Sequence, residues 1–411
     1  LQDQIIDEYE DATGIDAGAS TNELLTAGVY AGSTTATPTV TEDADDTGTD
    51  GDYSWYKWTD TAATGSYETD TTQDHEYLIV GGGASGGEEN GGGGGGGGVL
   101  AATGLSLTGG NTYTTTVGAG GAAVGANTNG NDGSDSILSG TGISTLTAGG
   151  GGGGGGASNG SGRAGRATNG NGGGGAYSNG GAGAGDGAGF DGGTQSSGAP
   201  EYGAAGGGGA GETGGGGSSS EAGDGGDGVA NDIIETGTNV YYAGGGGACA
   251  HNNQGSCGAA GNGGGGAGDY NGGAGAAMHG TANTGGGGGG STSGTNASGA
   301  GGSGIVILRR LTTVTAGGGD LTLQSNDTTA MTEPDYADMV ILMENAEGTA
   351  TLDTDIKGWI SKDSGSTFTQ GNLVDEGTWG TNKKILAFHD LDISAQSGTS
   401  MCYKITTHNQ S

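Results

Sequence analysis

The stretch EENGGGGGGGGVL, residues 88–100, decides how this chain can fold. It places eight consecutive glycines after a short acidic turn, and a second run of eight spans residues 149–156. Of the 108 glycines in the chain, 91 lie between residues 81 and 304. Glycine loses the most backbone entropy on folding and brings no side chain to bury. Such a segment either stays disordered or is held by dense backbone hydrogen bonding between close-packed strands.

Among ordered forms of polyglycine, collagen is excluded because the block has no sustained Gly-X-Y period and the chain has only three prolines. A silk-like sheet would need regular alternation with alanine or serine, which occurs only in patches. The third form is the extended left-handed helix with three residues per turn and a rise of roughly 3.1 Å per residue. Its amides point outward in three directions, and glycine lets neighbours approach on every side. We therefore predict a polyglycine-II-like hexagonal lattice in which nearly all amides are paired, because a bare buried amide is costly.

Non-glycine segments inside the block are predicted to form loops at the ends of this lattice. They are residues 88–90, 163–171, 194–202, 218–221, 249–257 and 278–284. Exposed aromatic side chains beside Asn and Asp could stack on a sugar or a protein loop, although they could equally cover the lattice ends. The candidate receptor-contact residues are Arg163, Arg166, Tyr177, Phe190, Tyr202, His251, Tyr270 and His279.

The rest of the chain is predicted to be mainly β. Residues 1–52 form an N-terminal attachment segment, in which residues 1–9 suggest a short amphipathic helix and residues 31–52 a linker or extended surface strand. Residues 53–80 form a small β module that leads into the glycine-rich domain, residues 81–310. Residues 311–411 carry short alternating runs that predict an antiparallel β-sandwich.

The individual strands follow from apolar runs and turn residues. Residues 77–80 and 305–308 have similar apolar character, so we expect them to pair where the block begins and ends. The expected strands are residues 53–58, 65–69, 75–80, 105–107, 113–117, 143–146, 240–242, 304–309, 320–324, 339–344, 350–352, 356–361, 385–389 and 401–406.

The charge of the chain bounds its partners. Against 46 acidic residues stand 10 basic ones, which gives a net charge of −36. This sign argues against binding nucleic acid phosphates or anionic lipid. The sequence shows neither a signal peptide nor an apolar run long enough to insert into a membrane, so we expect export, if any, by a route such as lysis.

Acidic and cysteine-containing segments raise the question of metals. Asp43, Asp45, Asp50 and Asp52 cluster near one another and offer the oxygen ligands that calcium prefers, with a solvated acidic loop as the alternative. A smaller group, Asp224, Asp227 and Asp232, invites the same two interpretations. No other cofactor is expected.

Two of the three cysteines are close in sequence. Cys249 and Cys257 flank a polar turn and could form a disulfide in an oxidising setting or remain free thiols. With His251 between them a metal site is a further alternative, although zinc would need two more ligands. Cys402 lies in an alternating run and is expected in a core.

The sequence contains no complete enzyme signature. Residues 78–86 fit G-x-G-x-x-G after a strand, but eight glycines follow shortly afterwards, where a dinucleotide-binding fold needs a helix. The five histidines are scattered and form no recognisable catalytic triad or metal signature. We therefore expect a protein that is not an enzyme.

Four stretches, taken together, carry a resemblance. They are LIVGGG (78–83), GNTYTTTVGAGG (110–121), YAGGGG (242–247) and GGSGIVI (301–307). Their order resembles the glycine-rich domains of phage and bacterial surface proteins, which occur in bacteriophage tail fibres and adhesins, some of them built as polyglycine-II sandwiches. Residues 12–16, 359–369 and 398–405 also look like modules of phage virion proteins.

The resemblance implies a virion protein, extracellular after release, that acts as a tail-fibre or receptor-binding subunit. Its expected partners are further copies of itself in a homotrimer, other virion proteins, and a glycan or protein of the host surface. Two other interpretations stay open. One is a purely structural head, tail or decoration protein without receptor contact, and the other is a prokaryotic cell-surface or extracellular filament protein.

Overall fold

The structure is a computed structural model that describes most of the chain. The described residues are 12–26, 29–125, 127–157, 160–163, 165, 169–176, 182–195, 203–219, 221–250, 256–269, 278–292, 297–317, 319–344 and 349–409. The chain divides into two compact units. The glycine-rich unit is Pro38–Thr312, and the terminal unit combines Leu1–Thr37 with Thr313–Ser411.

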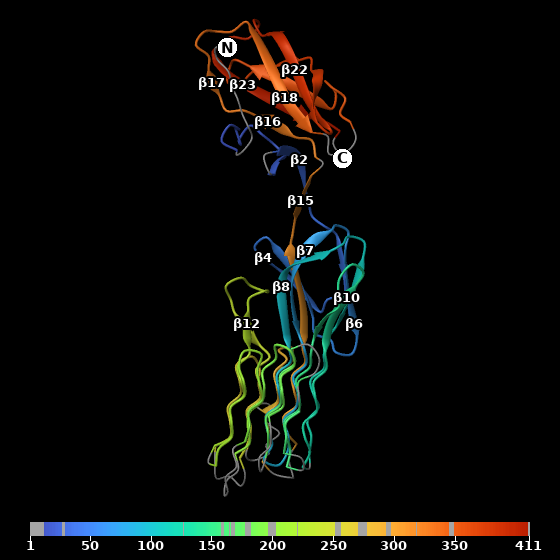
Figure 1. The fold of residues 1–411 in the computed structure, drawn as a ribbon, viewed down its shortest axis with the longest axis vertical. Coiled ribbons are helices and arrows are strands. Elements are labelled where there is room, and N and C mark those ends of the chain that lie inside the picture. Colours follow the sequence, from blue (N-terminus) through green and yellow to red (C-terminus); the bar gives the residue numbers. More distant parts are fainter. Residues whose placement is uncertain are drawn as a thin grey trace. The chain divides into compact units, whose positions relative to one another are not determined.

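All regular elements of the described residues are β-strands, so the predicted mainly β class is confirmed (Figure 1). The strands of the glycine-rich unit are β3 (Val40–Glu42), β4 (Asp46–Asp50), β5 (Tyr53–Trp58), β6 (Thr64–Thr69), β7 (Gln73–Val80), β8 (Val99–Leu107), β9 (Thr112–Thr116), β10 (Ser136–Gly140), β11 (Leu146–Ala148), β12 (Val229–Asn231), β13 (Val240–Tyr242) and β14 (Ile305–Leu311). The strands of the terminal unit are β1 (Glu23–Thr26), β2 (Val29–Ala36), β15 (Val314–Gly317), β16 (Thr322–Gln324), β17 (Thr328–Thr329), β18 (Tyr336–Glu344), β19 (Ile356–Ser361), β20 (Thr369–Gly371), β21 (Val374–Gly380), β22 (Lys383–Asp392) and β23 (Ser400–Thr407).

Two five-stranded antiparallel sheets form a sandwich at the base of the glycine-rich unit. One has the order β4-β5-β14-β7-β8 and the other β11-β10-β9-β6-β3. Their facing side chains share one core, in which Tyr67, Tyr113 and Leu138 are fully buried. The predicted pairing of the strands that enter and leave the block is confirmed, because Ile305 lies opposite Val80 in an antiparallel ladder.

The glycine segments extend away from this sandwich, side by side (Figure 1). Donors in the run 91–98 point to three different segments in turn. Gly91, Gly94 and Gly97 donate to residues 291, 288 and 285, each bond being 2.8–3.0 Å long. Gly92, Gly95 and Gly98 donate instead to residues 155, 152 and 149, and Gly93 and Gly96 to residues 205 and 208. This repeat of three is the period of the extended left-handed helix.

The same run accepts hydrogen bonds from three further segments. Its carbonyl groups bind amides of residues 81–87, of residues 171–174 and of residues 246–249. The central run therefore has six neighbouring segments, three through its donors and three through its acceptors. Six neighbours around one rod is hexagonal packing, so the hydrogen bonds agree with the predicted polyglycine-II-like arrangement.

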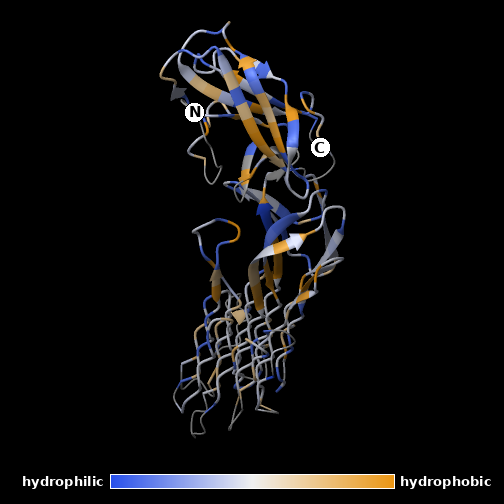
Figure 2. Ribbon diagram, turned by 45° about the horizontal axis from the view of Figure 1, so that its top comes forward, coloured by the Kyte–Doolittle hydropathy of each residue, from blue (hydrophilic) through white to orange (hydrophobic). Residues whose placement is uncertain are grey.

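Glycine is required in this lattice because neighbouring backbones touch. A Cβ atom added at Gly94 would lie 2.3 Å from the carbonyl oxygen of Ala84. One added at Gly151 would lie 2.1 Å from the carbonyl oxygen of Gly95. The glycines of the two eight-residue runs do not adopt positive φ angles, so close approach rather than unusual backbone conformation excludes a side chain there. In Figure 2 these segments are nearly neutral in hydropathy, and strongly hydrophobic strands lie in the sandwich.

Side-chain oxygens complete the pairing at an edge of the lattice. Gly150, Gly153 and Gly156 are three residues apart, and each donates its amide to a side chain. The acceptors are Asp135, Asp132 and Asn129, also three residues apart, at 3.0, 3.0 and 2.8 Å respectively. Carboxylate and amide oxygens thus replace the carbonyl groups of a missing neighbour, which satisfies donors that would otherwise face the edge unpaired.

The terminal unit contains a second sandwich. One sheet has the order β16-β23-β19-β20, and the other has the order β18-β22-β21. Leu323, Ile360 and Ile405 from the first sheet and Ile341 and Phe388 from the second belong to one buried core. The predicted antiparallel sandwich in residues 311–411 is therefore present. The remaining sheet, β1-β2-β15, brings residues 23–36 against the strand that follows the glycine-rich unit.

The unit boundaries differ from the predicted ones. Residues 40–50, which the sequence assigned to the attachment segment, form β3 and β4 of the base sandwich. Residues 29–36 form β2 of the terminal unit. Their Ser-, Thr- and Asp-rich composition gives little apolar alternation, and each becomes a strand because a partner supplies its hydrogen bonds.

Several strand predictions need correction as well. Residues 350–352 form only an isolated bridge, and residues 143–145 lie before β11. The apolar pattern did not predict β1, β10, β12, β15, β17, β20 or β21, which are short or largely polar. The helix predicted for residues 1–9 lies outside the described residues.

Candidate functional site at the outer end of the lattice

The outer end of the lattice is the end opposite the base sandwich, where the turn of residues 88–90 reverses the chain. Backbone hydrogen bonds fix this turn to two other segments. Glu88 donates to the carbonyl of Thr128 at 3.1 Å, and Ala157 donates to the carbonyl of Glu88 at 3.3 Å. Glu89 and Asn90 have positive φ angles of 60° and 53°, as a reversal of this kind requires.

Segments much farther apart in sequence meet at the same end. Gly91 donates to the carbonyl of Ser291 at 3.0 Å and accepts a hydrogen bond from Cys249 at 3.1 Å. Ala204 in turn donates to the carbonyl of Cys249 at 3.4 Å. Residues separated by up to 200 positions in sequence therefore lie at the same height along the lattice. Backbone hydrogen bonds rather than side-chain contacts hold them there.

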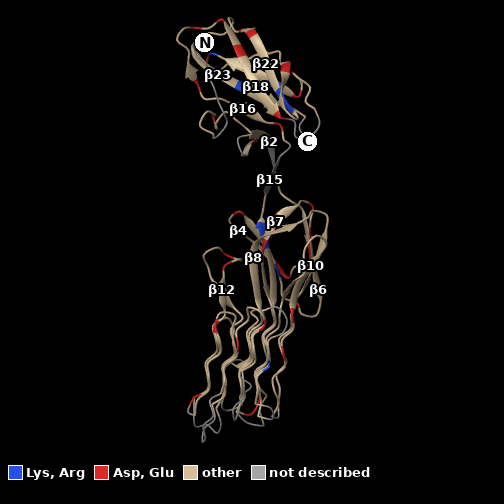
Figure 3. Ribbon diagram, in the orientation of Figure 1, with Lys and Arg blue, Asp and Glu red and all other residues tan. Residues whose placement is uncertain are grey.

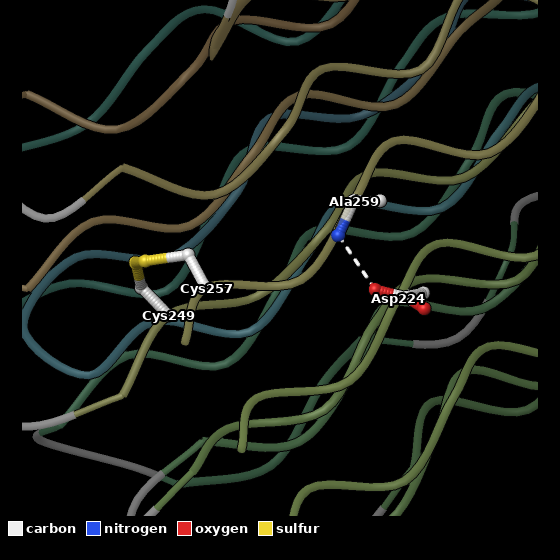
Figure 4. The surroundings of a disulfide bond; sticks show 4 residues. All are labelled: Asp224, Cys249, Cys257 and Ala259. Atoms are coloured by element: carbon white, nitrogen blue, oxygen red, sulfur yellow. Dashed lines mark hydrogen bonds between the residues drawn. A yellow bond between two sulfur atoms is a disulfide. The ribbon is translucent and has the colours of Figure 1, made fainter. Parts of the chain in front are cut away.

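A disulfide between Cys249 and Cys257 lies at this end, with Cα atoms 4.5 Å apart (Figure 4). It links two lattice segments that also pair directly, because Gly258 donates to the carbonyl of Ala248 at 2.9 Å. The structure thus answers the question left open by sequence, whether these two thiols are bonded, free or metal ligands. His251, the third member of the alternative metal site, lies outside the described residues.

Near the disulfide, Asp224 and Asp227 repeat the edge pattern seen at residues 129–135. Asp224 accepts the amide of Ala259 at 2.6 Å, the contact drawn in Figure 4. Asp227 accepts the amide of Asn262 at 2.8 Å. These carboxylates, considered as calcium ligands from sequence, are occupied by backbone donors. Their spacing of three residues, equal to one turn of the lattice helix, is the signal that the sequence analysis missed.

Glu88 is a buried carboxyl group within the outer turn. One oxygen accepts the amide of Asn127, and the other has no hydrogen-bond partner. Burial raises the pKa of Glu88, and the neighbouring negative charge of Glu89 adds to this shift. Because burial disfavours the ionised carboxylate, ionisation of Glu88 destabilises the packed outer turn. An acid in a short polar turn beside a glycine run gave no sequence signal of such burial.

The receptor-contact candidates do not form one site in the described part of the chain. Arg163 lies beside Asp132, with its Nε atom 3.6 Å from the carboxylate, and donates to the carbonyl of Gly130. Phe190 donates its amide to the side chain of Asn171 at 2.8 Å. His279 accepts the amide of Ala300 at 2.9 Å through Nδ1. Arg163 and Phe190 lie beside one segment, since their carbonyl groups accept from Gly173 and Gly172, whereas His279 pairs with a different segment. Arg166, Tyr177, Tyr202, His251 and Tyr270 lie outside the described residues.

The four proposed calcium ligands are not gathered either. Asp43 accepts from the indole of Trp58 at 3.1 Å. Hydrogen bonds from the backbone of Thr59 lower the pKa of Asp45 in spite of its partial burial.

The remaining two acids lie beyond this pair. The hydroxyl of Thr236 lowers the pKa of Asp50, which also lies 3.4 Å from Arg309. Asp52 is exposed, and its backbone carbonyl accepts from Thr312. In the described ranges, no three His, Cys, Asp or Glu side chains are placed to hold a metal ion.

Charged residues are distributed unevenly over the glycine-rich unit (Figure 3). Acidic residues are scattered along the lattice, whereas the basic residues of this unit are few. Arg309, which is mostly buried, lies in β14 and binds Glu76 at 2.8 Å. The same guanidinium donates to the carbonyl of Ile233, so it ties the segment after β12 to the base sandwich.

A comparison with known protein families identifies the family of the glycine-rich unit. The sequence profile of a family described as glycine-rich domain matches residues 59–311. The chain belongs to the glycine-rich domain family. The structure extends this glycine-rich domain toward the N-terminus, because β3, β4 and β5 complete the two sheets of its base sandwich.

A search of curated protein sequences returned no match. Within the described ranges, we find no helix of sufficient length and apolar character to span a lipid bilayer.

Proposed function

We propose that this chain is a non-enzymatic structural protein of a virus particle, a tail-fibre or receptor-binding subunit that presents short loops to a host surface. In this proposal, copies of the chain form a homotrimer that binds other virion proteins. The assembly is extracellular after release. The observation that carries the proposal is the outer end of the lattice. Segments around residues 88, 204, 249 and 291 end there together, although they lie far apart in the sequence.

The physical logic is that of a rigid support. Neighbouring lattice segments pair through amides in three directions, so a segment cannot move without breaking several hydrogen bonds. Short connections attached to such a support lose little conformational entropy on binding, which favours affinity. They can also vary in sequence with little disturbance of the lattice, because most of its hydrogen bonds join backbone groups.

The sequence resemblance and the charge support the same proposal. The order of glycine-rich elements is similar to that of phage tail-fibre and adhesin domains. The net charge of −36 suits a soluble surface exposed to salt, and it disfavours contact with phosphate-rich partners. The expected partner is therefore a glycan or protein of the host surface.

Binding of the purified full chain to a panel of bacterial cells and to an array of bacterial surface glycans tests the proposal. One variant replaces residues 251–255, between the two cysteines, with a Gly-Ser segment of equal length. The matched control changes Thr238 and Asn239, exposed residues between β12 and β13 at the opposite end, to alanine. We expect the first variant to lose binding at least tenfold and the control to retain it.

Two other results would redirect the proposal. If the chain binds no cell or glycan and immunogold labelling of intact particles finds it within a closed shell or tube, a structural role without receptor contact is supported. If labelling finds it on cells and not on particles, a prokaryotic surface or filament protein is supported.

A further inference from the structure

An apolar surface lies on the outer face of the sheet β18-β22-β21 in the terminal unit. Along β18, buried and exposed residues alternate, so that Val340 and Leu342 point away from the core and are 61% and 59% exposed. In the neighbouring strand, Ala387 lies opposite Val340 and Ile385 lies opposite Leu342. On the other side of β22, Val374 of β21 lies opposite Ala387, is 54% exposed and continues the apolar row across the sheet.

This face holds an unusual share of the exposed apolar side chains. Of the eleven large hydrophobic residues that are exposed in the described chain, Tyr336, Val340, Leu342, Val374 and Trp379 belong to β18 and β21. A hollow of about 400 Å³ opens beside Val374, Ala387 and His389. Contiguous apolar surface on a soluble domain commonly marks an interaction site.

Charged residues frame the apolar rows in a regular way. The two acids Asp338 and Glu344 lie at the two ends of the outer face of β18. Two basic groups, Lys383 and His389, lie at the corresponding ends of β22. Each strand separates its two groups by six residues, or about 20 Å in a β-strand. Within the sheet, Glu344 lies 3.1 Å from Lys383, and Asp338 lies 3.7 Å from His389.

We propose that this face binds the same face of a second copy of the chain. A two-fold axis parallel to the strands, between β18 and β22, lays β18 of one copy over β22 of the other. Glu344 then faces Lys383 of the second copy, and Asp338 faces its His389. Leu342 covers the second copy's Ile385, and Val340 lies over its Ala387, a small side chain already buried in the sheet. Because both strands use the same six-residue spacing, both charged ends match at once, which makes the surface complementary to itself.

The dimensions of the face set the expected strength of the contact. In this arrangement only β18 and β22 overlap, and two strands about 4.8 Å apart and roughly nine residues long cover on the order of 300 Å². A stable interface of standard size buries about 800 Å² per partner. Because the overlap is well below this size, we expect weak, reversible pairing rather than a permanent dimer. Three copies cannot share one self-complementary face, so a homotrimer would need a different surface.

Sedimentation of the full chain over a range of concentrations tests this pairing. We expect the mass to rise with concentration, above 38.8 kDa if the free chain is a monomer and above three times that value if it is the homotrimer proposed above. Leu342→Glu should weaken association at least tenfold, because it places a charge in the apolar centre. Val240→Glu, at an exposed residue of β13 in the other unit, is the matched control and should leave association unchanged. Circular dichroism checks that both variants stay folded.

A charge exchange makes the test specific. Lys383→Glu and Glu344→Lys should each weaken self-association at least tenfold, because like charges then face each other. An equimolar mixture of the two variants should pair as well as the unmodified chain, since each contact again joins an acid and a base. A mass that stays constant at all concentrations, association unaffected by Leu342→Glu, or a mixture that fails to pair would each overturn the proposal.

Discussion

The glycine lattice and the base sandwich belong to the same unit but are stabilised in opposite ways. In the sandwich, Tyr67, Tyr113 and Leu138 fill a buried core and remove apolar surface from water. In the lattice, backbone amides of residues such as 91–98 bind six neighbouring segments, and side chains contribute little. The sandwich therefore depends on side chains that fill its core, and the lattice depends on the absence of side chains between its segments. One added methyl group should destabilise the lattice as much as the loss of a buried side chain destabilises the sandwich.

The sharpest test of this contrast adds a single methyl group. Gly94→Ala places a Cβ atom 2.3 Å from the carbonyl oxygen of Ala84, a backbone atom with no room to yield. We expect a loss of at least about 3 kcal/mol in the free energy of unfolding and faster hydrogen exchange in the six surrounding segments. Gly125→Ala is the control, because a Cβ atom there meets nothing within 4 Å. Equal stability of the two variants would contradict the close-packed lattice.

The matching test removes volume from the sandwich. Leu138→Ala should cost about 2–5 kcal/mol, since Leu138 is fully buried between the two sheets. Thermal unfolding followed by tyrosine and tryptophan signals reports this loss. The comparison is sharpened if hydrogen exchange in the lattice also rises, which would show that the lattice needs its base in order to persist. Unchanged exchange beyond residue 81 would show that the lattice is stable independently.

Removal of the disulfide tests the outer end alone. The variant in which Cys249 and Cys257 are both replaced by serine reopens a loop with a sequence separation of eight residues. The expected cost is about 2–3 kcal/mol, on the chain-entropy account of cross-links. Hydrogen exchange should increase near residues 248 and 258 and stay unchanged in the base sandwich. A uniform increase through both regions would show that they unfold together.

The edge of the lattice offers a smaller effect. Asp132→Ala removes the acceptor of the Gly153 amide and the partner of Arg163. We expect a loss of about 1 kcal/mol, the usual scale of one hydrogen bond. Asp132→Asn keeps an acceptor oxygen and should recover most of the stability. If both variants lose the same amount, the negative charge rather than the edge hydrogen bond is the important property.

The smallest expected effect concerns Glu88 and depends on pH. Its pKa is raised in the folded protein, so the folded state binds the proton more tightly than the unfolded chain does. The stabilising effect of protonation is complete below the ordinary pKa of glutamate and is lost as the pH rises through the raised pKa. Glu88→Gln, which cannot ionise, should therefore raise the melting temperature at pH 7 and leave it nearly unchanged below about pH 4. A gain that is equal at both pH values would contradict burial as the cause.

The base sandwich shows how much of the fold can be predicted from apolar pattern. Residues 77–80 and 305–308 share a continuous apolar run, and their predicted pairing is confirmed. Strands such as β3 and β4, rich in Thr and Asp, were assigned to a linker because they alternate weakly. Their partners are β6, whose Tyr67 is fully buried, and the aromatic β5, so register with a neighbour rather than their own composition makes them strands.

The candidate site was harder to predict than the scaffold. Loop positions 88–90 and 218–221 follow from where glycine gives way to polar residues. Which loops share an end does not follow, because it depends on the path of every segment through the lattice. Arg163, Phe190 and His279 were grouped by residue type, and the structure places His279 beside a different segment from the other two.

The sequence by itself determined that any order in the centre of this chain must come from backbone hydrogen bonds, since only glycine permits approach on every side and the glycine block has few apolar residues for a core. The tertiary structure alone decided which segments are neighbours. Glycine segments are chemically almost identical, so amide pairing carries no preference for one partner over another. The choice comes from the sandwich at the base, the edge carboxylates and the turns, whose side chains differ and therefore fix the order of the segments.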